Sequence, residues 1–273
     1  MDIIDKEKNL LSSPAPRDAD GEEGITFFDS SAFADRVSLA GRGKDEGKVL
    51  IAAARLYEDE DLVAYDKSTG VNCDDFPLRI HRLDKDTSGV FLVAKNQKAL
   101  EFFQKQFKER EVEKRYTALI TGHLKNEEGV AKTLIGRSPK DKRKQKVYLL
   151  NQPGSEGKRE AITKYKLLQR FENYDLIEAE PKTGRKHQIR AHFAHLNHPI
   201  AGDKLYGFKN QPCPEGLKRQ FLHATYLKIK MPDGETKEFQ SELPEDLKKV
   251  LEKLVKEDKS YFPPSSAKGG LGK

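Results

Sequence analysis

The feature that most constrains the fold is a short apolar run, VFLVA at residues 90–94, which directly follows a polar segment, HRLDKDTSG at residues 81–89. The apolar run is rich in β-branched and aromatic residues, which is typical of a buried strand. The polar segment therefore places a carboxylate, Asp84, beside a rigid element, as a catalytic side chain requires. Taken alone, the same segment is equally compatible with a solvated turn.

The pattern of elements along the 273 residues predicts an α+β fold with a sizeable core. Further strands are predicted at 114–121, 145–150, 161–168, 174–180 and 221–231. Helices are predicted at 97–110, at 188–196 and after Pro244, where the apolar residues recur at helical spacing. Strands and helices do not alternate regularly, so we expect a mixed, largely antiparallel central sheet with flanking helices.

The chain is expected to consist of one folded body with polar ends. Residues 1–24 are polar and predict a disordered tail, and residues 25–48 predict a linker or N-terminal extension too short and polar for a separate RNA-binding domain. The folded domain is expected at 49–258. Residues 259–273 are rich in Pro, Ser and Gly and predict a flexible tail.

The charge distribution favours a polyanionic partner. The chain carries 50 Lys and Arg against 44 Asp and Glu, a net charge of +6. Seven acidic and three basic side chains lie in the first 24 residues, so the remainder carries +10. RNA is one such partner, although ordinary solubility charge explains the excess equally well.

Two further observations bear on the compartment. No apolar run reaches the ~20 residues that a membrane span needs, and we expect neither a signal peptide nor a membrane partner. The two cysteines, Cys73 and Cys213, lie far apart in the sequence and suit a reducing compartment, so a cytoplasmic location is expected.

Two basic segments are candidates for contacts with a nucleotide. In KRYTAL, residues 114–119, Tyr116 enters a strand directly after Lys114 and Arg115, so that the ring can stack on a base while the cations meet phosphate. A tyrosine that merely packs in the sheet is the alternative. In KTGRKHQIRAH, residues 182–192, a glycine turn and four basic residues precede or begin a helix, which predicts a phosphate-binding corner.

Histidines at 187, 192, 195 and 198 raise the alternative of a metal site. The chain has no HExxH pattern there, and no Asp or Glu lies between positions 181 and 202, so no metal is expected.

Two loops remain. HPIAGDKLYG, residues 198–207, is fixed by Pro and two glycines and is expected to brace the preceding helix. The run 140–146 contains five bases and one acid, among them Lys142 and Arg143, and either clamps a phosphate backbone or is a solvated loop.

In their order and spacing these segments resemble the RluA-type pseudouridine synthases. HRLDKDTSG is similar to the first motif of that family, KRYTAL to its tyrosine motif, and TGRKHQIRAH with HPIAGDKLYG to its third block. LHA, residues 222–224, is similar to the short leucine motif, and the resemblance covers roughly residues 56–240. At the first strand this chain has KSTG, residues 67–70, where the family usually has Lys-Pro-x-Gly, and its stretch 70–81 is shorter.

The resemblance implies isomerisation of uridine in ribosomal or transfer RNA to pseudouridine, without metal or cofactor. A monomer is expected. The glycosidic bond would be cleaved, the uracil rotated, and C5 joined to C1′, after the nucleotide has been flipped out. A carboxylate suits the positive character that develops at C1′, and a guanidinium beside it keeps it ionised.

The resemblance also implies roles for individual residues. Asp84 would be the catalytic carboxylate, paired with Arg190. Tyr116 would stack on the uracil and take part in moving the C5 proton, and Leu222 would form an apolar wall. Arg82 would fill the gap left by the flipped nucleotide. The remaining RNA contacts are expected from Lys114, Lys142, Arg143, Arg185 and His187.

Two other functions remain open from the sequence. A non-catalytic RNA-binding protein on the same scaffold would not need Asp84 near phosphates. A metal-dependent hydrolase would need the histidine cluster.

Overall fold

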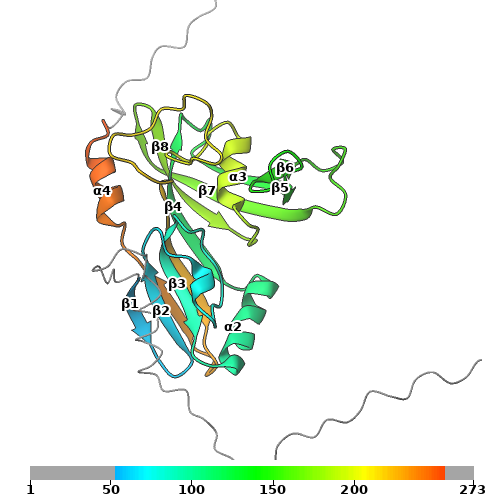
Figure 1. Cartoon of the computed structure of the whole chain (residues 1–273), viewed down its shortest axis with the longest axis vertical. Helices are drawn as coiled ribbons and strands as arrows, with labels where there is room; N and C mark the ends of the chain where they lie inside the picture. The colour runs from blue at the N-terminus through cyan, green and yellow to red at the C-terminus, as the bar shows by residue number, and fades with distance from the viewer. Residues whose placement is uncertain (1–52, 256–273) are drawn as a thin grey trace, which may run out of the picture.

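In the computed structural model, which describes residues 53–255, one twisted ten-stranded sheet runs through the length of the molecule (Figure 1). The tails expected at 1–24 and 259–273 and the extension at 25–48 lie outside the described residues. The strands are β1 Ala53–Glu58, β2 Leu62–Lys67, β3 Ser88–Ala94, β4 Glu113–Thr121, β5 Glu128–Arg137, β6 Gln145–Tyr148, β7 Arg159–Phe171, β8 Tyr174–Pro181, β9 Leu222–Lys230 and β10 Thr236–Gln240. Their order in the sheet is β1-β2-β3-β9-β4-β8-β7-β5-β6, with β10 paired to β9.

All strand pairs but one are antiparallel, so the expected α+β fold with a mixed, largely antiparallel sheet is confirmed. Three α-helices flank the sheet: α2 Gln97–Glu109, α3 Gln188–His195 and α4 Glu245–Glu252. Each lies within two residues of its predicted position. None of the helices in the part of the chain that the structure describes has the length and apolarity needed to cross a membrane.

Strands β1, β5 and β10 were not predicted from the sequence. The β5 sequence EGVAKTLIGR contains two glycines and charged residues on its exposed face, which hide the alternation. Strand β10 has only five residues and gains its hydrogen bonds from β9. The predicted strand at 145–150 ends at Tyr148 because Leu149 and Leu150 turn into solvent.

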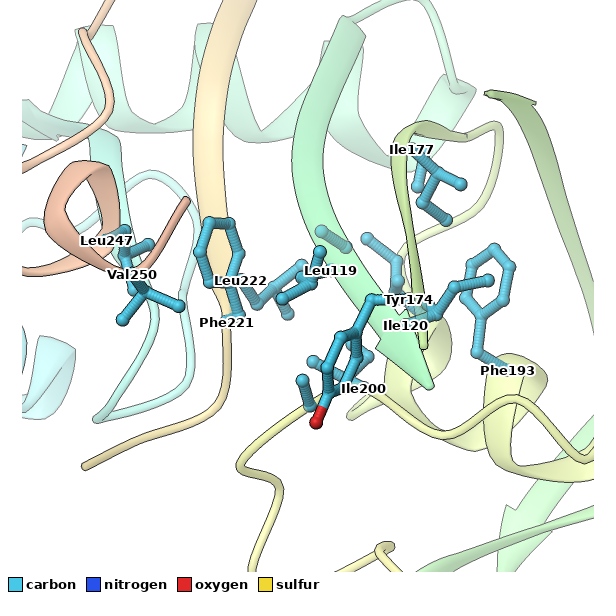
Figure 2. Packing of buried hydrophobic residues seen from close by; sticks show 14 of the residues in the cluster. Leu119, Ile120, Tyr174, Ile177, Phe193, Ile200, Phe221, Leu222, Leu247 and Val250 are labelled. Carbon is cyan, nitrogen blue, oxygen red and sulfur yellow. The ribbon is translucent and has the colours of Figure 1, made fainter. Parts of the chain in front are cut away.

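The buried strand β3 divides the core, as its continuous apolar sequence predicts. Val90 and Leu92 pack under helix α2, whereas Phe91 and Val93 pack on the opposite face with Phe76 and Leu83. A third cluster joins β4, β8 and β9 to helices α3 and α4, with Leu119, Leu222 and Leu247 among its members (Figure 2). The segment that carries Asp84 is therefore anchored through buried Leu83.

The one parallel pairing, between β3 and β9, brings the two halves of the sheet together at the Asp84 segment. Gly89 makes this approach possible: its φ is +112°, and a Cβ there would lie 2.2 Å from the Ala224 carbonyl oxygen. A side chain at position 89 would push β9 away. Leu222, at the start of β9, therefore lies beside the segment that precedes β3.

Lys67 is a completely buried lysine at the end of β2, within the KSTG segment. Its Nζ donates hydrogen bonds to the carbonyls of Ser68, Val71 and Lys85 at 3.0, 3.0 and 3.1 Å. These carbonyls belong to two loops, so one ammonium group fixes both. The short stretch 70–81, which contains only a 3₁₀ turn at Cys73–Asp75, is held in this way without a proline.

We expect Lys67→Met to lower the free energy of unfolding by about 2 kcal/mol, because three carbonyls lose their hydrogen-bond donor. Hydrogen exchange of the Gly70 amide, which bonds to the Lys85 carbonyl, should accelerate as well. Chemical denaturation and amide exchange measure these effects. The substitution of exposed Lys98 by Met is the control, and equal losses in both variants would contradict the prediction.

Candidate active site

A cavity of about 400 Å³ opens where the Asp84 segment, β4, the loop before α3 and the start of β9 meet. Asp84, Tyr116, Arg190 and Leu222, which lie as far as 138 positions apart in sequence, all line it. So do the other predicted RNA contacts Arg82, Lys114, Arg185 and His187. The structure thus gathers eight of the ten candidate residues around one cavity.

Asp84 begins a tight turn in which the Thr87 amide donates to the Asp84 carbonyl at 3.0 Å. Two cations brace this turn from opposite ends. Lys67 holds the Lys85 carbonyl, and buried Arg219 donates to the Asp86 carbonyl and the Ser88 hydroxyl, each at 3.1 Å. The rigid support that the sequence assigned to strand β3 therefore comes equally from these two side chains.

The Asp84 carboxylate faces two different groups. Its Oδ2 accepts a hydrogen bond from Arg190 Nη1 at 2.7 Å, whereas Oδ1 lies 3.6 Å from His187 Nε2. The pairing of Arg190 with Asp84 that the resemblance implied is therefore present. One carboxylate oxygen is held by the guanidinium, and the other faces the cavity.

Arg190 itself is held by a second carboxylate. Arg190 Nε and Nη2 donate to Asp203 Oδ2 and Oδ1 at 2.7 and 2.9 Å, a bidentate pair. Asp203 Oδ1 also accepts the amides of Leu205 and Tyr206. Burial disfavours the charged form of each side chain, but the hydrogen bonds and the opposite charge of the partner favour it more strongly. The pKa of Asp203 is therefore lowered and the pKa of Arg190 is raised.

Tyr116 lies on β4 at a bulge in its pairing with β9 and packs against two of the core clusters. Burial, together with the Asp84 charge, raises the pKa of its phenol well above the ordinary value. Tyr116 is therefore a neutral phenol at neutral pH. That state suits stacking and hydrogen bonding, and it disfavours a phenolate that removes a proton.

The loop before helix α3, where the sequence predicts a phosphate-binding corner, is held by the first helical residue. The Gln188 side-chain oxygen accepts the Arg185 amide at 3.0 Å and the Thr183 hydroxyl at 2.7 Å, so the position of this loop relative to the helix is fixed. His187 occupies the N-cap position with a φ of +54° and makes no capping hydrogen bond. Its strained backbone directs the ring toward Asp84 instead.

The lining of the cavity is basic. It includes Arg159, Lys186, Lys114 and Arg185, and among residues 53–255 Asp84 is the only acidic residue that lines it. Arg185 donates to the Glu160 carbonyl at 2.9 Å, and burial next to other arginines lowers its pKa. Such a lining attracts a polyanion toward a single carboxylate.

Lys142 and Arg143 lie outside the cavity, on the loop between β5 and β6. The Arg143 side chain is highly exposed and donates to Asp141 at 2.8 Å. This pairing leaves Lys140, Lys142 and Lys144 to carry the excess positive charge of the loop.

The histidines of the predicted metal alternative have separate partners. His192 is buried and contacts the hydroxyls of Thr133 and Thr163 at 2.9 and 2.8 Å, and His198 contacts the Thr121 carbonyl at 3.1 Å. Within residues 53–255, no three His, Cys, Asp or Glu side chains lie where they could share a metal ion.

Four residues that shape the site escaped sequence reasoning: Arg159, Asp203, Tyr206 and Arg219. The loop of Asp203 was expected to brace the preceding helix, and it does so through Arg190. No helical or strand spacing connects these four residues to Asp84. Their contacts with the site form only when the segments that carry them are folded. The one available signal was an acidic residue, Asp203, in a loop that Pro and Gly hold in a fixed conformation.

Lys114 offers a test by pH. Burial, with a smaller effect from Lys182, lowers the pKa of Lys114 to about 8. The lysine is charged below that pH and neutral above it, so affinity for RNA should fall as pH rises from 7 to 9, with the loss of roughly one phosphate contact. Lys114→Arg should remove this pH dependence and retain affinity, in binding measurements at fixed salt. A wild-type affinity that stays constant while the protein remains folded would contradict the assignment.

Comparison with known proteins agrees with this geometry. A family model described as RNA pseudouridylate synthase matches residues 3–195 of the chain. An uncharacterized RNA pseudouridine synthase of Chlorobaculum parvum is 38% identical over 244 residues, which cover 73% of this chain and 73% of that protein. The ribosomal large subunit pseudouridine synthase D of Haemophilus ducreyi is 33% identical over 233 residues, covering 81% of this chain and 66% of that protein.

Among solved structures, human RNA pseudouridylate synthase domain containing 1 superposes with a TM-score of 0.61 at 26% identity, covering 76% of this chain and 97% of that one. The chain spans 54% to 73% of the lengths of four similar curated proteins.

Proposed function

The chain belongs to the RNA pseudouridylate synthase family and is an isomerase that converts uridine in RNA to pseudouridine. From this premise we propose that Asp84 is the catalytic carboxylate of the enzyme. The observation that supports this role is the Asp84 carboxylate itself, held by Arg190 at one oxygen and open to a cavity at the other. An ionised carboxylate in this position can stabilise or capture the positive charge that develops at C1′.

The surrounding residues complete the reaction in this proposal. Arg190 holds and orients the Asp84 carboxylate through its hydrogen bond to Oδ2. Tyr116 and Leu222, on the adjacent strands β4 and β9, enclose the detached uracil so that it rotates without escaping. Because its phenol is protonated, Tyr116 contributes stacking and a hydrogen bond. The proton that leaves C5 passes to solvent and N1 takes up one proton, so the isomerisation is balanced.

Access to a stacked uridine requires flipping, which costs a few kcal/mol. Arg82 is exposed at the rim of the cavity and is our candidate for the side chain that occupies the vacated position. Lys114, Arg185 and His187 contact the flipped nucleotide, and Lys142 and Arg143 contact the RNA backbone farther away. No cofactor is required.

We further propose that the substrate is ribosomal RNA, because several relatives are named as ribosomal large subunit pseudouridine synthases. We also propose a monomer as the active form. The two cysteines are both unpaired, which supports a cytoplasmic location.

The experiment is to incubate the wild-type chain, without added metal, with uridine-containing ribosomal RNA and, separately, with transfer RNA, and to map pseudouridine chemically. New pseudouridine in the ribosomal RNA is expected. Product only in transfer RNA would overturn the proposed substrate. Salt-dependent binding of both RNAs with no product in either would favour the non-catalytic RNA-binding alternative.

A further inference from the structure

Tyr206 connects the cavity to the β5–β6 hairpin, and no motif or comparison assigns it a role. It lies in the loop after α3 and is 8% exposed. Its hydroxyl oxygen accepts the Gln145 amide, at the start of β6, at 2.6 Å. The same hydroxyl lies 3.0 Å from His187 Nδ1.

The contact with Gln145 leaves the phenolic proton of Tyr206 available for donation to His187 Nδ1. The Gln145 amide can only donate, so the Tyr206 oxygen is an acceptor in that bond. The hydroxyl has one proton of its own, and His187 Nδ1 is the acceptor within its reach. Burial raises the pKa of Tyr206 to about 12, so this proton is present at neutral pH.

The tautomer of His187 follows. If Nδ1 accepts the proton of Tyr206, the neutral imidazole carries its own proton on Nε2. This Nε2–H lies 3.6 Å from Asp84 Oδ1, the oxygen that Arg190 does not hold. The opposite tautomer would turn a lone pair toward the carboxylate, which is electrostatically unfavourable.

The geometry points to Tyr206 as a positioning residue that fixes His187 in the Nε2–H tautomer, so that His187 presents a hydrogen-bond donor to the reactive oxygen of Asp84. This inference rests on the proposed function of Asp84. At 3.6 Å the Nε2–H group is beyond a hydrogen bond in the free enzyme, so the proposed donation requires the carboxylate and the imidazole to approach each other by a few tenths of an ångström when substrate binds.

Other contacts of Tyr206 keep its hydroxyl in place. Its amide donates to Asp203 at 3.0 Å, its ring meets the His187 ring edge-on at 5.6 Å, and the Arg190 guanidinium carbon lies 5.1 Å from its ring centre. Because the Tyr206 hydroxyl contacts both β6 and His187, the position of β6 influences which nitrogen of His187 carries the proton.

The first test is spectroscopic. Nitrogen-15 NMR of imidazole-labelled full-length protein, at a pH where His187 is neutral, should show the Nε2–H tautomer in the wild type. In Tyr206→Phe, Nδ1 loses its donor, and the Nδ1–H tautomer should become populated. A wild type in the Nδ1–H form, or an unchanged tautomer in the variant, would overturn the inference.

The second test is a double-mutant cycle on pseudouridine formation. Tyr206→Phe should lower kcat roughly tenfold with KM within about twofold, since a misdirected donor affects the reacting atoms more than binding. In the His187→Gln background the same substitution should have little further effect. Equal losses in both backgrounds would show that Tyr206 does not act through His187.

Two controls separate this inference from its premise. Tyr174→Phe removes the hydroxyl from another buried tyrosine, 5% exposed, that lies in the core cluster away from the cavity, and kcat should be unchanged. If Asp84→Asn retains full activity, the proposed role of Asp84 fails, whereas the tautomer measurement still decides the link between Tyr206 and His187.

Discussion

Asp84→Asn should abolish pseudouridine formation, with kcat reduced by at least roughly 10³-fold, while the protein stays folded and still binds RNA. Asn occupies the same volume but lacks the negative charge that the cleavage at C1′ requires. Arg190 remains paired with Asp203, so its charge is not left without a partner. We therefore expect a loss of only about 1 kcal/mol in the free energy of unfolding.

RNA affinity distinguishes this prediction from a binding defect. Removing the single negative charge from a basic cavity should leave Kd the same or slightly lower. The measurements are single-turnover product formation at saturating enzyme and, separately, equilibrium binding. Asp86→Asn is the control, because Asp86 is an exposed carboxylate two positions away in the same turn, and its activity should match that of the wild type. Equal activity in both variants would remove Asp84 from the mechanism.

The elements of this fold were predictable where local pattern determines them. The apolar run of β3, the amphipathic helix at 97–110 and the strand that carries Tyr116 each follow from residue periodicity. Strand β10 was not predictable, because a five-residue edge strand depends on a partner far away in the sequence. The same reason explains why the sequence did not reveal that β3 and β9 are parallel, a pairing that depends on the approach allowed by Gly89.

For the site, the sequence identified the side chains that face the cavity but not those that hold them. Asp84, Tyr116 and Arg190 stand in segments whose composition is unusual for a plain turn or strand. Asp203 contacts Arg190 directly, and Arg219 contacts the Asp86 carbonyl in the turn that Asp84 begins, in both cases at separations that follow no helical or strand period. Supporting residues of this kind become visible only when the loops are folded, because buried charges are satisfied by whichever neighbours the tertiary structure supplies.

Asp203 is the supporting residue whose loss should have the largest effect on stability. Asp203→Ala leaves the buried Arg190 guanidinium with Asp84 alone and also removes the acceptor of two loop amides. We expect the free energy of unfolding to fall by about 3 kcal/mol, near the low end for breaking a buried ion pair because Asp84 remains. Activity should fall roughly 10- to 100-fold, because a freed guanidinium no longer orients Asp84.

The variant Asp203→Asn and the pH dependence of stability test whether these losses come from the missing negative charge beside Arg190. Asn retains one oxygen for the amides of Leu205 and Tyr206 but places an NH₂ group near Arg190, so it should lose activity with a smaller loss of stability. The pKa of Asp203 is lowered in the folded state from an ordinary value of 3.8, so its contribution is fully present above that pH and declines as pH falls further. The stability difference between wild type and Asp203→Asn should therefore be constant near neutrality and should narrow below pH 3.8.

The matched control is Asp175→Asn. Asp175 is also completely buried, and it accepts hydrogen bonds from Arg170 and the Leu124 amide, on β8 and away from the cavity. This variant should lose stability without losing kcat per folded molecule, in denaturation and single-turnover assays made side by side. If both variants lose activity only in proportion to their loss of stability, then Asp203 contributes to the fold alone. Asp84 would then keep its orientation even when Asp203 does not hold the Arg190 guanidinium.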